Sequence, residues 1–182
     1  YSCKTQDNFV FVEFLILLKG QGTKELCNLK IDDSVEMTGP LGNTFPLPKE
    51  DLQNADEVKI AIIGGGIGVA PVAGFSTNLK PHTYDFYACF KSFSYGLENV
   101  KAKNLVITTD DGTEGKKGML PSVFTADDIK QKNYSVVYAC GPEPMLKYVQ
   151  KVCLEAGITC YLSMEQRMAC GLGACLGCTI TT

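Results

Sequence analysis

The sequence predicts an α/β fold, a doubly wound parallel sheet, preceded by a partial antiparallel β-barrel and followed by a short cysteine-rich segment. From residue 58 onward, apolar β-forming runs alternate with segments of helical periodicity, which is typical of parallel sheets covered by helices. Before residue 46 the apolar runs are separated by glycine-containing turns, as expected for part of a barrel. Three cysteines lie close together between positions 170 and 178.

The chain is predicted to divide into three segments. Residues 1–54 form the C-terminal part of the barrel, residues 55–165 the α/β domain and residues 166–182 the start of the cysteine-rich segment. The polar stretch 46–54, which contains two prolines, is the predicted linker. The sequence begins without Met and stops within a β-branched stretch, so we expect it to be part of a longer protein.

In the barrel segment the sequence predicts two strands and one short helix. Residues 9–18 (FVFVEFLILL) are apolar and rich in β-formers, which predicts a buried strand. Thr23 is the expected N-cap of a helix that extends to Leu29. Residues 33–38 are expected to form a further strand that ends in the turn 39–43.

The α/β segment begins with residues 58–63 (VKIAII), a continuous apolar run that predicts a central strand buried on both faces. Gly157 is the expected C-terminal end of the helix predicted at 144–156. The other predicted elements are helices at 69–79 and 144–156 and strands at 83–90, 104–109, 134–139 and 159–164.

Composition excludes several classes of protein. With 17 Lys and Arg against 20 Asp and Glu the net charge is −3, which argues against a nucleic-acid partner. No run approaches the roughly 18 apolar residues of a membrane span. A single His rules out a histidine metal cage. Nine cysteines without a visible signal peptide predict reduced thiols and a cytoplasmic location.

A glycine turn joins the first α/β strand to its helix. Glycines at such a turn let the backbone approach phosphates, and the helix N-terminus favours anions. Gly64 and Gly66 fit the dinucleotide pattern G-x-G-x-x-G, whereas Val69 stands where the third glycine belongs. The alternative is a tight structural turn. The candidate nucleotide-binding residues are Gly64, Gly65, Gly66, Ile67 and Gly68.

Two further loops follow predicted strands, at the edge where open α/β sheets bind ligands. One contains Thr109, Asp110 and Asp111, and the other contains Cys140, Gly141 and Pro142. Ordinary turns also favour Asp, Gly and Pro, and a free cysteine is commonly a small buried hydrophobe. No acidic residue ends the strand 83–90, so this cue leaves both NAD and NADP open.

The cysteines at 170, 175 and 178 have the spacing C-x4-C-x2-C. This is the first part of the plant-type [2Fe–2S] ferredoxin pattern, which needs a fourth cysteine. Glycines between them allow backbone N–H groups to point at the sulfurs. A zinc knuckle and three unrelated thiols are the alternatives. Cys170, Cys175 and Cys178 are therefore candidate metal ligands, and we expect the fourth ligand beyond Thr182.

The segments GGGIGVAP, TTDDGTEGKKG, YACGPEPML and MEQRMACGLGACLGC resemble those of a known family, in the same order. The family is the electron-transfer subunits of NAD-linked, two-subunit bacterial dihydroorotate dehydrogenase, within the ferredoxin reductase-like flavoproteins. The resemblance implies that the barrel binds FAD, the α/β domain binds NAD (with NADP as an alternative) and the C-terminal segment binds [2Fe–2S].

The resemblance also implies roles for individual residues. Tyr1 and Ser2 are similar to the end of the family's flavin motif, and Gly22 and Thr23 match its FAD diphosphate contact. Cys140 and Glu165 are expected near the nicotinamide and the flavin ring, where "catalytic" is a loose label for both.

The mechanism that the resemblance implies is an electron relay in pyrimidine biosynthesis. Electrons from dihydroorotate would leave an FMN-containing catalytic subunit, pass through [2Fe–2S] to FAD, and reach NAD. The partner would be that FMN subunit, in a heterotetramer. One alternative is a related reductase that serves a hydrogenase or a sulfur-reducing partner. Another is a non-enzymatic redox or metal-binding module.

Overall fold

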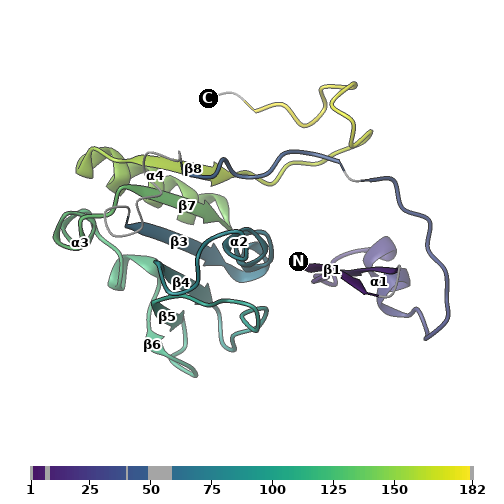
Figure 1. The fold of residues 1–182 in the computed structure, drawn as a ribbon, viewed down its shortest axis with the longest axis horizontal. Helices are drawn as coiled ribbons and strands as arrows, with labels where there is room; N and C mark the ends of the chain where they lie inside the picture. The colour runs from purple at the N-terminus through teal and green to yellow at the C-terminus, as the bar shows by residue number, and fades with distance from the viewer. Residues whose placement is uncertain (1, 7–8, 40, 49–58, 181–182) are drawn as a thin grey trace.

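A parallel sheet forms the centre of the computed structural model, which describes residues 2–6, 9–39, 41–48 and 59–180 (Figure 1). In this described part the sheet has six strands in the order β6-β5-β4-β3-β7-β8, and all neighbours run parallel. The predicted doubly wound sheet is therefore confirmed. The strands are β3 (Ile60–Gly65), β4 (Tyr84–Phe90), β5 (Asn104–Thr109), β6 (Lys116–Lys117), β7 (Val136–Cys140) and β8 (Thr159–Ser163).

The chain order of the strands creates a switch point between β3 and β7. From β3 the chain moves outward through β4, β5 and β6, and then returns to place β7 on the other side of β3. In open α/β sheets, ligands bind at the carboxyl ends of the strands beside such a point. The glycine turn after β3 and the loop after β7 both lie there.

Helices cover both faces of the sheet (Figure 1). On one face α2 (Val69–Ser76) buries Val69, Val72 and Phe75 against the sheet. On the other face lie α3 (Ala126–Lys132) and α4 (Glu143–Ala156), and α4 buries Leu146 and Val149. All six residues of β3 are buried, as predicted for a central strand. Full burial of such apolar side chains contributes about 1.5–3 kcal/mol each.

Most predicted α/β elements are present with small shifts at their ends. The strand at 104–109 matches β5, and Gly157 ends α4 in the left-handed conformation with φ +73°. The helix expected at 69–79 ends at Ser76 and is preceded by a 3₁₀ turn at Gly66–Gly68. The sequence reasoning missed β6, α3 and a 3₁₀ turn at Leu120–Ser122.

The N-terminal segment forms a hairpin and a short helix. Strand β1 (Ser2–Gln6) pairs antiparallel with β2 (Phe9–Glu13), and α1 spans Gln21–Cys27. The buried strand predicted over 9–18 is wrong in two ways: it ends at Glu13, and Phe9 is 69% exposed. A two-stranded hairpin has no second layer to cover its apolar side chains.

Two further predictions for this segment need correction. Residues 33–38 are irregular rather than a strand, because a strand requires a hydrogen-bonded neighbour and the described chain provides none there. The N-cap of α1 is Gly20 rather than Thr23. Thr23 lies one turn inside, where its Oγ1 accepts hydrogen bonds from Lys19 N at 2.9 Å and Gly20 N at 3.0 Å. It still satisfies free N–H groups at the helix start.

The start of the predicted linker packs on the sheet. The ring of Phe45 lies edge-on against Phe75 and Tyr138, with centroids 5.3 and 5.5 Å away. The Tyr138 hydroxyl donates a hydrogen bond to the Pro46 carbonyl at 2.9 Å. Residues 49–54 of the predicted linker lie outside the described residues. In the described part, no helix is long and apolar enough to cross a membrane.

A buried polar network lies at the amino end of β4. Asp85, only 8% exposed, accepts hydrogen bonds from Tyr134 Oη and from Asn104 Nδ2. Lys132 Nζ lies 3.6 Å from the Asp85 carboxylate and donates to Tyr87 Oη at 2.7 Å. Burial, together with the hydrogen bond to Asp85, raises the pKa of Tyr134 above its usual range. The network is fully paired and therefore stabilises the fold.

Asp85→Ala is expected to lower the free energy of unfolding by about 2 kcal/mol, because it leaves buried donors without an acceptor. Urea unfolding followed by circular dichroism measures this change. Lys151→Ala is the matched control, since it removes only an exposed i,i+4 pair with Glu155. Equal unfolding midpoints for Asp85→Ala and the unmodified protein would contradict a stabilising role.

Candidate functional site

The carboxyl ends of β3, β4, β5 and β7 enclose a cavity of about 530 Å³. Its volume is within the range of small-molecule sites. Four residues predicted from the sequence line it: Gly65, Gly66, Asp110 and Pro142. The remaining lining residues are Cys89, Phe90, Lys91, Met119, Leu120, Pro121, Pro144, Met145 and Tyr148.

The glycine turn leaves β3 at Gly65 and enters α2 at Val69. Gly66 has φ +54°, the left-handed region that favours glycine. Gly68 approaches the loop after β7 so closely that a Cβ there would lie 2.5 Å from the Cys140 carbonyl oxygen. The turn therefore needs glycine both for its conformation and for its packing.

Gly64 explains why Val69 can occupy the third glycine position of the dinucleotide pattern. A Cβ on Gly64 would lie 2.7 Å from Val69 Cγ2 and 2.9 Å from Val69 Cα. The third glycine normally permits close packing of helix and strand. Here the strand residue provides that space, and Val69 is fully buried.

The loop after β7 lies against the glycine turn. Cys140 pairs with Gly64 in the β3–β7 register. A Cβ on Gly141 would lie 2.5 Å from Met145 Cε and 3.1 Å from Gly65 Cα. The structure thus brings together two loops that the sequence had separately placed at the binding edge.

The loop after β5 is held by its own side chains. Thr109 is buried, and its Oγ1 donates to the Glu114 carbonyl at 2.6 Å. Asp111 accepts hydrogen bonds from Ser92 Oγ and from Thr113 N, which lower its pKa to about 2. Of the three predicted residues, Asp110 alone lines the cavity, while Thr109 and Asp111 shape the loop.

Glu165 lines a second cavity at the same edge, and Cys140 directly precedes Gly141 of that cavity but lines neither cavity itself. This second cavity of about 550 Å³ is lined by Gly141, Pro142, Glu165 and residues of the C-terminal segment. Burial raises the pKa of the Cys140 thiol, and the nearby charge of Glu165 adds to this, although a hydrogen bond with Ser163 opposes it. Cys140 is therefore a neutral thiol at neutral pH.

Cys140 is expected to react with iodoacetamide about tenfold more slowly than exposed Cys27 at pH 7.5, because the thiolate is the nucleophile. Its rate should continue to rise with pH beyond the usual thiol pKa, since the thiolate forms only as the pH approaches the raised value. Mass spectrometry of alkylated peptides measures both rates. Comparable rates for the two thiols at neutral pH would contradict this expectation.

The predicted flavin-binding residues lie in the N-terminal hairpin and helix. Tyr1 is outside the described residues, and Ser2 begins β1. Gly22 and Thr23 lie in α1, which Figure 1 shows beside the hairpin and separate from the sheet. Neither Gly22 nor Thr23 is among the residues that line the two cavities.

The C-terminal cysteines lie in an irregular segment that follows β8 (Figure 1). Backbone N–H groups of Cys175 and Leu172 point at Cys170 Sγ and lower its pKa to about 6. The Leu172 nitrogen lies 3.4 Å from that sulfur. Gly171 and Gly173 have φ of +67° and +78°, which lets the loop curl around Cys170, as predicted.

The donor set fits an iron–sulfur centre in its chemistry. Thiolates with N–H···S hydrogen bonds are what such centres require, and the surroundings of Cys170 already favour the thiolate. Over residues 2–6, 9–39, 41–48 and 59–180, however, no three His, Cys, Asp or Glu side chains converge to hold a metal ion. Convergence of Cys170, Cys175 and Cys178 remains a prediction.

Sequence reasoning missed most of the apolar wall of the cavity beside the glycine turn. Met145 and Tyr148 come from α4, while Met119 and Leu120 come from the loop before α3. These side chains are distant along the chain and have no shared motif. Lys91 had a usable signal, because it directly follows a predicted strand at the binding edge.

Comparison with known proteins relates these features to named relatives. Residues 165–182 match the family model described as the iron-sulfur cluster binding domain of dihydroorotate dehydrogenase B. Over 173 residues the chain is 42% identical to the dihydroorotate dehydrogenase B (NAD(+)) electron transfer subunit of Clostridium acetobutylicum, covering 94% of this chain and 66% of the relative.

Two further relatives carry the same description. The subunit of Caldanaerobacter subterraneus subsp. tengcongensis is 36% identical, with coverage of 90% of this chain and 63% of the relative. That of Clostridium perfringens is 35% identical, with coverage of 94% and 68%. The chain thus spans about two thirds of the length of these relatives.

A solved structure, that of an NADH-dependent reduced ferredoxin-NADP oxidoreductase, shares the fold. One of its chains superimposes with a TM-score of 0.68 at 22% identity, covering 88% of this chain and 58% of that chain. At this identity the likeness concerns the fold alone, and it agrees with the ferredoxin reductase-like arrangement of the parallel sheet.

Proposed function

This chain belongs to the family of electron transfer subunits of dihydroorotate dehydrogenase B (NAD(+)), and we propose that it relays electrons from a dihydroorotate-oxidising subunit to NAD in pyrimidine biosynthesis. One observation carries the proposal. A single chain combines a cavity beside a glycine turn at the switch point of the sheet with a cysteine segment that matches an iron–sulfur domain.

NAD is the proposed ligand of the cavity of about 530 Å³ beside the glycine turn. The turn formed by Gly64, Gly65, Gly66, Ile67 and Gly68 would bring backbone N–H groups and the N-terminus of α2 to the pyrophosphate. Gly141 and Pro142 close the opposite side. Asp110, which is one of the residues that line the cavity, favours NAD over NADP, because a carboxylate accepts from a ribose hydroxyl and repels an extra phosphate.

FAD would be bound by the N-terminal segment, where Tyr1, Ser2, Gly22 and Thr23 are the proposed contacts. In this proposal, residues 1–54 are part of the FAD barrel, residues 55–165 form the NAD domain, and residues 166–182 begin the cluster segment. Cys140 and Glu165 would lie where nicotinamide and flavin meet. Cys140 contributes an uncharged thiol there, which adds no negative charge beside the reacting rings.

The cluster is proposed to be [2Fe–2S], with Cys170, Cys175 and Cys178 as three of its ligands. Backbone N–H groups around Cys170 stabilise negative charge on sulfur before any metal binds. An iron–sulfur centre supplies one-electron transfer, and flavin couples it to the two-electron chemistry of NAD. The partner is an FMN-containing catalytic subunit, in a heterotetramer in the cytoplasm.

Coexpression of the full-length subunit with the dihydroorotate-oxidising subunit of the same organism tests this function. The purified complex, with FAD and iron verified, should form NADH from NAD when dihydroorotate is added, and each subunit alone should not. A complex that contains both cofactors but transfers no electrons from dihydroorotate to NAD would contradict the proposal. Transfer from another donor in its place would favour a reductase with a different partner.

A further inference from the structure

The charges that line the cavity beside the glycine turn are few. Among its lining residues Lys91 is the single cation and Asp110 the single anion. A dinucleotide brings two negative charges on its pyrophosphate. The N–H groups of the glycine turn compensate part of that charge. Lys91 is the lining residue whose positive charge can neutralise more of the pyrophosphate charge.

Lys91 is placed beside the glycine turn by strand pairing. It directly follows β4, and in the β3–β4 register Cys89 pairs with Gly65. Its carbonyl accepts a hydrogen bond from Asp111 N at 3.3 Å, which fixes the backbone. Its ammonium forms no ion pair with any residue that the structure describes, and the side chain is exposed. An anion in the cavity therefore meets a cation that has no competing partner.

The loop that carries Lys91 is held rigidly against the loop after β5. Ser92 Oγ donates to Asp111, and Ser94 donates from both its backbone N and its Oγ to Glu114, each at 2.8 Å. These hydrogen bonds lower the pKa values of both acids, so both carboxylates are ionised and the hydrogen bonds persist at neutral pH. Pre-ordering of the loop reduces the entropy cost of ligand binding.

Tyr95 lies at the end of the loop that carries Lys91. Its ring packs edge-on against Phe90 with a centroid distance of 4.8 Å. Its hydroxyl lies 3.7 Å from the position that a Cβ on Gly66 would occupy. A hydroxyl donor is thus held next to the residue at which the turn adopts its left-handed conformation.

We propose that Lys91 and Tyr95 form the outer wall of the phosphate site, where the Lys91 ammonium pairs with the pyrophosphate of the bound dinucleotide and the Tyr95 hydroxyl donates a hydrogen bond to it. This inference rests on the proposed function, because it assumes a dinucleotide at the glycine turn. The competing explanation is a lysine that is solvated and contributes nothing, which is common for exposed lysines.

The test compares Lys91→Met with the unmodified full-length subunit in calorimetric titrations with NADH and with ADP-ribose. Both ligands contain the pyrophosphate, and both should bind about tenfold more weakly to the variant, as expected for loss of a charge-assisted contact. Lys91→Arg should retain most of the affinity. Tyr95→Phe should weaken NADH about threefold. Affinity of the unmodified subunit should fall with added salt more steeply than that of Lys91→Met.

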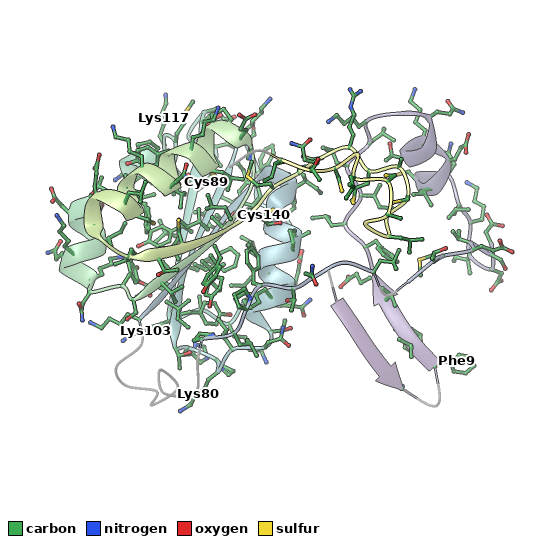
Figure 2. The ribbon with its side chains drawn as sticks, turned by 90° about the horizontal axis from the view of Figure 1, so that it is seen from above. Phe9, Lys80, Cys89, Lys103, Lys117 and Cys140 are labelled. Carbon is green, nitrogen blue, oxygen red and sulfur yellow. The ribbon has the colours of Figure 1, made fainter. Side chains whose placement is uncertain are left out.

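Lys103→Met is the matched control. Lys103 is also exposed, but it lies at the opposite end of the sheet, where its N–H bonds to the Tyr84 carbonyl (Figure 2). Affinity of Lys91→Met within twofold of the unmodified protein, or an equal loss in Lys103→Met, would overturn the inference while leaving the proposed function intact. An unmodified subunit that binds no NADH would overturn both.

Discussion

Gly68→Ala is expected to weaken NADH binding by about 10²-fold and to lower the free energy of unfolding by about 3 kcal/mol. The added Cβ would lie 2.5 Å from the Cys140 carbonyl oxygen and 2.7 Å from Gly141 Cα. These are backbone atoms of a loop fixed by the β3–β7 pairing, so no side-chain rotation relieves the clash. The two loops must separate, which moves the glycine turn away from the position that a pyrophosphate requires.

Calorimetric titration with NADH and urea unfolding measure the two effects of Gly68→Ala separately. Gly39→Ala is the matched control, because its added Cβ would meet only Leu41 N, at the ordinary distance of 3.9 Å. It should leave NADH affinity unchanged. If Gly68→Ala bound NADH as tightly as the control, the close approach of the two loops would not matter for the site.

Cys170→Ser in the full-length subunit is expected to reduce bound iron at least about tenfold after anaerobic reconstitution with iron and sulfide. A serine hydroxyl is less acidic than a thiol, and its oxygen is a harder donor than a thiolate sulfur. The N–H groups that point at Cys170 Sγ then have no thiolate to stabilise. Iron content and the visible circular dichroism of the cluster measure the loss without relying on enzyme activity.

Cys27→Ser serves as the control for Cys170→Ser. Cys170 is half-buried, whereas Cys27 is exposed and lies in α1 rather than in the C-terminal segment. Its replacement should leave iron content and the visible spectrum unchanged. Retention of a full cluster in Cys170→Ser would remove Cys170 from the ligand set and would require another residue in its place.

The core strands could be predicted because local composition determines them. Residues 60–65 and 136–140 are continuous apolar runs, and burial on both faces requires such runs. In contrast, α3 has only Ile129 buried, so its apolar periodicity is weak. Its usable signal was the capping box, in which Thr125 Oγ1 accepts from Asp128 N and the Asp128 carboxylate accepts from Thr125 N.

The strand expected at 33–38 is an error of the opposite kind, because the sequence predicts an element that the structure does not form. Val35 and Met37 alternate with polar residues, yet both are exposed and the segment is irregular. Alternation indicates that a segment can be half-buried in a sheet, but it carries no information on whether a neighbouring strand is present to receive its hydrogen bonds. That information depends on residues far away in the chain.

The sequence by itself determined the parallel α/β sheet, the glycine turn and the cysteine run, because each depends on residues that are adjacent or regularly spaced. Only the tertiary structure decided which of these residues meet. It packed Gly68 against Cys140, brought Lys91 and Asp110 to one cavity with Met145, and used Thr109 and Asp111 to hold loops. Pairing of β4 and β7 on either side of β3 sets these distances, and no local pattern encodes the choice of neighbouring strand.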